Sequence, residues 1–92
     1  MFGLGWLFAG ALIGAAVITI CVAFLNTNVA RDKARAECPD AVKLAVRSVV
    51  KSGNINVVKM DALDDDGDTI NEISFEADEV GSDIYVGKKI YT

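Results

Sequence analysis

The hydrophobic pattern divides the chain near residue 30. Residues 1–30 contain no charged side chain, and residues 2–25 are almost entirely apolar. A helix of about 24 residues rises about 36 Å, which is enough to cross a hydrocarbon core of about 30 Å. The pattern therefore predicts a transmembrane helix within residues 1–30. A cleaved signal peptide is the alternative, but it has a basic start and an apolar core of only about 7–15 residues.

Beyond this anchor, the polar pattern predicts a charged connector and then a second helix. Residues 31–38 are mostly charged, and Pro39 suits the first turn of a new helix. Over residues 39–52 the valines share one helical face, whereas Leu44 falls on the polar side. Three basic residues at helical spacing form the opposite stripe: Lys43, Arg47 and Lys51. This segment is predicted to be an amphipathic helix.

From residue 55 the hydrophobic period shifts towards two, which indicates strands. Strands are expected over 55–63, 69–77 and 84–91, with a turn at 64–68 and a loop at 78–83. The predicted fold class is therefore α+β: an N-terminal transmembrane helix, a second amphipathic helix and a small three-stranded antiparallel sheet. The expected domains are an anchor (1–30), a juxtamembrane connector (31–38) and a small acidic α+β module (39–92).

The charge distribution suggests an orientation and a contact surface. The net charge is −4. Residues 31–53 carry six basic and three acidic side chains, a net of +3, and residues 54–92 carry three basic and ten acidic ones, a net of −7. Basic residues that follow the apolar run predict an N-terminus outside the cell and a cytoplasmic module. The expected contacts with a membrane surface or a partner are Arg31, Lys33, Arg35, Lys43, Arg47 and Lys51. A solvated basic face is the alternative, and the acidic distal module argues against nucleic acid as a partner.

Small residues repeat along the apolar run. Gly10 and Gly14 form a G-x-x-x-G pair, and Ala11 and Ala15 stand one position further on. Such a face allows close packing of two membrane helices, so we expect a homo-oligomer. The alternative is chance, since glycine and alanine are common in membrane helices.

The chain offers little for catalysis. It has no histidine and two cysteines, so no metal-ligand set is predicted. The acidic stretch Asp64–Asp68 is predicted to be a turn with Gly67 in the left-handed conformation. Read as a calcium loop, it would place Ala62 and Ile73 at the two end positions, where acidic ligands belong. Weak binding of a divalent ion stays open, and we expect no enzyme, no catalytic residue and no cofactor.

Residues 7–35 resemble the short single-pass membrane proteins of unknown function carried by bacterial phages and integrative elements. The likeness lies in a Gly/Leu-rich span, the late Cys21 and the exit at Ala30, Arg31 and Asp32. It implies a membrane location and no particular activity.

The sequence therefore predicts a membrane-anchored, non-catalytic interaction module that self-associates, with the lipid bilayer and an unidentified protein as partners. The alternative is a structural subunit of a membrane, virion or filament assembly, packed through its apolar N-terminal helix.

Overall fold

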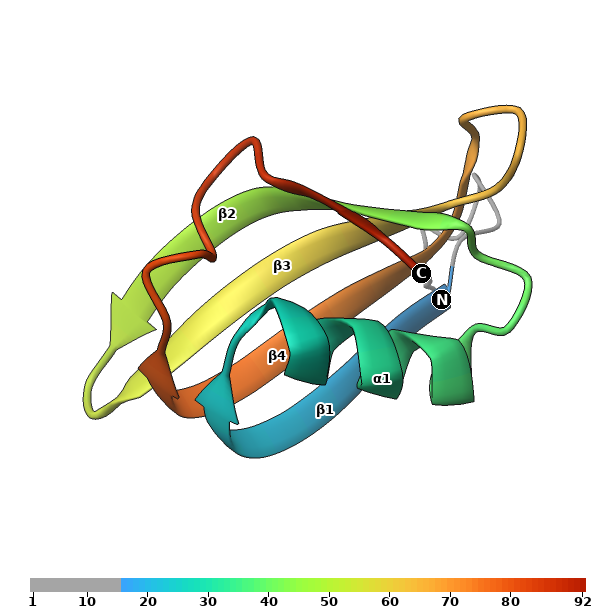
Figure 1. The fold of residues 1–92 in the computed structure, drawn as a ribbon. Coiled ribbons are helices and arrows are strands. Elements are labelled where there is room, and N and C mark those ends of the chain that lie inside the picture. The colour runs from blue at the N-terminus through green and yellow to red at the C-terminus, as the bar shows by residue number, and fades with distance from the viewer. Residues whose placement is uncertain (1–15) are drawn as a thin grey trace, which may run out of the picture.

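The computed structural model describes residues 16–92, which form one five-stranded sheet and a helix that lies across one of its faces (Figure 1). The strand order is β1-β4-β3-β2-β5, with β1 parallel to β4 and the other pairs antiparallel. The elements are β1 (Ala16–Leu25), α1 (Thr27–Glu37), β2 (Lys43–Ser52), β3 (Ile55–Leu63), β4 (Thr69–Val80) and β5 (Lys89–Tyr91).

The second half of the predicted membrane helix is strand β1. Half of its ten residues are β-branched, and such side chains restrict χ1 and favour a pleated surface. Asn26 then caps α1, since its side-chain oxygen accepts a hydrogen bond from the Val29 N–H at 2.8 Å. Within residues 16–92, no helix has both the length and the apolar character needed to cross a bilayer. The predicted transmembrane helix is therefore wrong, as is the single-pass localisation with its N-terminus outside and a cytoplasmic module.

The predicted amphipathic helix at 39–52 is also wrong, because residues 43–52 form β2. Leu44, the misfit of the helical pattern, is fully buried beside Val46, whereas Lys43 and Ala45 are only partly buried. That alternation is the period of a strand, and the valines suit it. Residues 31–37 of the expected connector are the last seven residues of α1. The helix-led α+β fold with a three-stranded sheet is thus replaced by a five-stranded mixed sheet with one short helix.

The later strand predictions are closer to the structure. Strand β3 occupies the predicted 55–63, and β4 covers the predicted 69–77 and continues to Val80. Gly67 has a φ of 87° in the intervening turn, which confirms its left-handed conformation. Strand β5 takes only residues 89–91 of the predicted 84–91.

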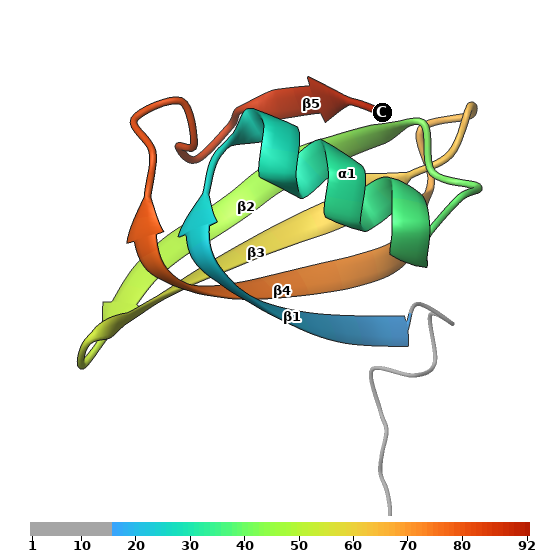
Figure 2. The ribbon, with the colours of Figure 1, turned by 60° about the horizontal axis from the view of Figure 1, so that its bottom comes forward.

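The core lies between α1 and the sheet (Figure 2). Ala30 and Ala34 of α1 are fully buried, and their small side chains let the helix lie close to the strands. The largest fully buried side chains are Phe75, Leu25, Leu44, Met60, Ile73, Ile90 and Val58. We call the sheet face under α1 the inner face and the opposite one the outer face.

The loop after β4 fixes the corner between β1 and α1. Asp83 Oδ2 accepts hydrogen bonds from the Thr27 hydroxyl at 2.7 Å and from the Thr27 N–H at 3.0 Å. These bonds, the hydroxyl's first, lower the pKa of the Asp83 carboxyl. The Gly81 N–H donates to the Leu25 carbonyl at 2.8 Å, and a Cβ on Gly81 would stand 3.2 Å from the Phe24 ring. The loop after β4 therefore holds the end of β1 through Leu25 and the start of α1 through Thr27.

Candidate interaction site

Strand β1 forms one edge of the sheet. It pairs with β4 along its whole length, from Ala16↔Asn71 to Leu25↔Val80, without a shift of register. On its other side, none of the strands in residues 16–92 lies beside it (Figures 1 and 2). An edge strand presents a row of backbone N–H and C=O groups that another strand can pair with.

The register shows which backbone groups of β1 face outward. The Leu25 carbonyl accepts from Gly81, on the β4 side. In a regular strand both polar groups of one residue point to the same edge, and the edge alternates from residue to residue. The odd-numbered residues of β1 therefore bond to β4. The even-numbered ones direct their N–H and C=O groups to the open edge: Ile18, Ile20, Val22 and Phe24.

The β1 sequence lacks the devices that usually protect an edge strand. Its ten residues include no charge, proline or glycine. Val17 and Phe24 are 63% and 44% exposed, although both are large and apolar. On the inner face, three β-branched side chains pack against the core but stay only partly buried: Ile18, Ile20 and Val22. Strand β1 is thus an uncharged strip that no other strand in residues 16–92 covers on its outer edge.

The opposite edge is short and covered with charge. Strand β5 pairs with β2 only from Lys43↔Tyr91 to Ala45↔Lys89. The Tyr91 carbonyl accepts a hydrogen bond from Arg31 Nε at 3.0 Å, and Lys43 Nζ lies 5.9 Å from the centre of the Tyr91 ring. This edge has the features that discourage strand addition.

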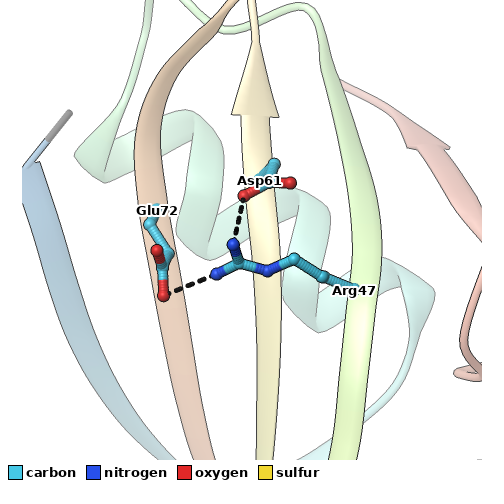
Figure 3. Close-up of polar contacts among 3 residues, drawn as sticks. All are labelled: Arg47, Asp61 and Glu72. Atoms are coloured by element: carbon cyan, nitrogen blue, oxygen red, sulfur yellow. Dashed lines mark ion pairs between the residues drawn. The ribbon is translucent and has the colours of Figure 1, made fainter. Parts of the chain in front are cut away.

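The outer face carries an ion-pair network at its centre. Arg47 reaches from β2 across β3 to β4, with nitrogens 3.7 Å from Asp61 and 2.7 Å from Glu72 (Figure 3). The hydrogen bond to Glu72 is the main cause of the raised pKa of the Arg47 guanidinium. A register shift between Val46 and Ser48 accompanies this reach. The network links three strands. Because Arg47 is paired with two carboxylates, its positive charge is already compensated within the chain.

The six basic residues expected to contact a membrane surface or a partner lie at separate places on the fold. Arg31 and Lys43 converge on Tyr91. Lys51 pairs with Asn56, and the shift at Arg47 puts it on the face opposite Lys43. The two remaining cations are exposed on α1: Lys33 and Arg35. The predicted helix-packing residues lie outside the part of the chain that the structure describes: Gly10, Ala11, Gly14 and Ala15.

The acidic turn between β3 and β4 brings three carboxylates together. Oxygens of Asp64, Asp66 and Asp68 lie within 4.8 Å of one another. The Asp64 side chain accepts hydrogen bonds from the N–H groups of Asp66 and Asp68, at 2.9 and 3.0 Å. Calcium takes six to eight oxygen ligands, so these carboxylates make a partial set. The Asp64 carboxylate closes the turn through these two bonds.

The two cysteines differ in access. Cys38 is 5% exposed, and burial, with the nearby Glu37 charge, raises the pKa of its thiol. Cys21 is exposed on the outer face of β1, where its sulfur lies 3.8 Å from Glu76 Oε1. Only Cys21 is therefore accessible on the candidate edge.

The sequence prediction missed the β1 edge. The β-branched residues within 17–22 indicate a strand but not its place at an edge, and the length of the surrounding apolar stretch obscured even that. The resemblance of residues 7–35 to short phage membrane proteins stays a prediction. No protein-family model, curated protein or solved structure matches the chain, and the case for the β1 edge rests on the chain's own geometry.

Proposed function

We propose that this protein is a non-catalytic interaction module that binds an extended segment of a partner along the β1 edge. The observation that carries the proposal is the uncharged ten-residue strand at the end of the sheet order. A partner strand laid beside it would form main-chain hydrogen bonds with the outward groups of β1. Its alternate side chains would contact the apolar rows on the two faces.

Hydrogen bonds and apolar burial at this edge can together supply the binding free energy of a specific complex. Each backbone hydrogen bond formed there contributes about 0.5–1.5 kcal/mol net. Burial of apolar side chains such as Val17 adds about 25 cal/mol per Å² removed from water. These contributions act together along the strand, so affinity depends on the length of the paired segment.

The edge is also preorganised. Strand β1 is bonded to β4 along its length, and the bond from Gly81 to Leu25 holds its end. The bonds between Asp83 and Thr27 fix the following helix. A partner therefore meets a strand that is already ordered, which lowers the entropic cost of binding.

Site-specific photo-crosslinking of the full chain in its host tests the proposal. A photoreactive side chain at Thr19 should give protein adducts that disappear when Ile20→Pro removes an outward N–H. The same probe at Lys33, exposed on α1, is the matched control and should give few adducts. Equal adducts at both positions, or adducts unaffected by Ile20→Pro, would contradict the proposed binding edge.

A further inference from the structure

We infer that the strand occupying the β1 edge is β1 of a second copy of this chain, paired antiparallel about a two-fold axis perpendicular to the sheet. The inference rests on the proposed function and names its partner. Two five-stranded sheets would then join into one continuous sheet. Such an interface uses the same patch twice and closes at a dimer.

The alternation along β1 allows an axis through a single residue, and the two registers that pair nearly the whole strand place it at the centre, through Ile20 or Cys21. In an antiparallel pair, directly opposed residues point to the same face of the sheet. An axis through Ile20 opposes Ile18 to Val22 of the second copy, and an axis through Cys21 opposes Cys21 to itself. In both registers the outward groups of the even-numbered residues bond across the axis. Both copies of α1 then lie on the same side of the joint sheet.

The chemistry of β1 is self-complementary. Because the strand is uncharged, no like charges face each other across the axis. The partly buried row of Ile18, Ile20 and Val22 would meet the same row of the second copy and extend the core across the junction. The nearest acidic residues, such as Glu76, are on β4. The β4 backbones that carry them would be about 14 Å apart across the junction, three strand spacings, and the Glu76 carboxylate leans towards β1, to 3.8 Å from Cys21 Sγ.

The rest of the chain favours a second copy over the chain's own N-terminal segment. To cover the edge itself, the segment before β1 would have to turn back through a hairpin loop of about two to five residues. It would then place Gly5 and Gly10 inside the ladder, where glycine weakens a strand. A second β1 contains no glycine. In the antiparallel pair, the Ala16 ends of the two β1 strands lie at opposite ends of the junction.

The oligomeric state of the purified full chain tests the inference by sedimentation. We expect a dimer that Ile20→Pro and Thr19→Lys each weaken about tenfold or more, which corresponds to about 1.4 kcal/mol. Val50→Lys, at another exposed apolar position of the sheet, is the matched control and should leave the dimer intact. Circular dichroism checks that each variant folds, and Thr19→Lys decides the question if Ile20→Pro does not fold.

Cysteine crosslinking determines the register of the two paired β1 strands. Oxidation with copper–phenanthroline should link Cys21 to Cys21 of the second copy when the axis passes through Cys21. When the axis passes through Ile20, the Thr19→Cys variant should form the link to Cys21 of the second copy. A dimer that forms neither link, or that both edge variants leave unchanged, would overturn the inference.

The two proposals can fail separately. A monomeric chain whose Thr19 probe still gives Ile20-dependent adducts with another protein would overturn the second-copy inference and leave the proposed function standing. A monomeric chain without such adducts would contradict both.

Discussion

The two edges of this sheet differ in how they meet solvent. Strand β5 is three residues long, begins at Lys89 directly after Lys88, and its Tyr91 carbonyl accepts a bond from Arg31. Strand β1 is ten residues long and has no charged residue. Short strands and lysines discourage strand addition, and long uncharged strands invite it. One edge of the sheet is thus blocked, and the other has the properties of a binding surface.

Proline substitutions in β1 should change stability most, and by different amounts on the side that faces β4 and on the side that faces the open edge. Cys21→Pro removes an N–H that faces β4, which should lower the free energy of unfolding by about 3 kcal/mol or more. Ile20→Pro removes an N–H that faces the open edge and should cost less than half as much. Urea unfolding, with both variants kept monomeric by Thr19→Lys, gives the comparison. Equal losses would contradict the assignment of the outward residues.

The next effect comes from removing the protection of the β5 edge. Lys88→Val with Lys89→Val exposes an uncharged strand at the second edge, so we expect new association through β5 and species larger than the dimer. Light scattering measures the mass. The control is Lys33→Val with Arg35→Val, which removes two cations from exposed positions of α1. If both pairs of substitutions raised the mass equally, lost charge rather than edge chemistry would be responsible.

A smaller effect is expected on the outer face, away from both edges. The Arg47 side chain is 49% exposed, so its ion pairs are screened by solvent. Arg47→Met should lower the free energy of unfolding by about 1 kcal/mol or less, as for other exposed pairs. Dimerisation should not change. A tenfold loss of dimer in this variant would show that the outer face, not the β1 edge, makes the contact.

The smallest effect concerns the corner that holds the end of β1. The pKa of Asp83 is lower in the folded chain than its ordinary value of 3.8. Its contribution to stability is therefore complete above that value and is lost as the pH falls through the lower folded-state pKa. Asp83→Asn should destabilise the chain slightly at neutral pH and not at all in strong acid. Thermal unfolding at several pH values checks this, and a pH-independent difference would contradict it.

The sequence predicted the centre of the fold better than its edges. Strand β4 was recognised because Ile73, Phe75 and Ala77 alternate with polar residues. The sequence predicts helices at 16–25 and 39–52, where the structure has strands. Apolar residues follow one another in these stretches, so the alternation typical of a strand is weak or absent. In the second stretch, the off-pattern Leu44 and the several valines are the signs of a strand.

The candidate site could not be located from sequence, because being at an edge is a property of strand order. The partner of β1 is β4, as in the pair Ile20↔Phe75, and these residues stand 55 positions apart. No feature of the sequence at residues 16–25 indicates that one side of the strand is paired and the other is open. The sequence shows which residues are basic. It does not show which of them contact Tyr91, which one pairs with Glu72 and which stay in solvent, because these contacts depend on the fold.

Residue-resolved amide hydrogen exchange on the full chain reports directly whether a second strand pairs with the β1 edge. We predict that the Ile20 amide exchanges slowly when the protein is concentrated and quickly on dilution or in Thr19→Lys. The Cys21 amide, which faces β4, should stay protected throughout. Fast exchange at Ile20 at every concentration would show that no second strand pairs with the β1 edge.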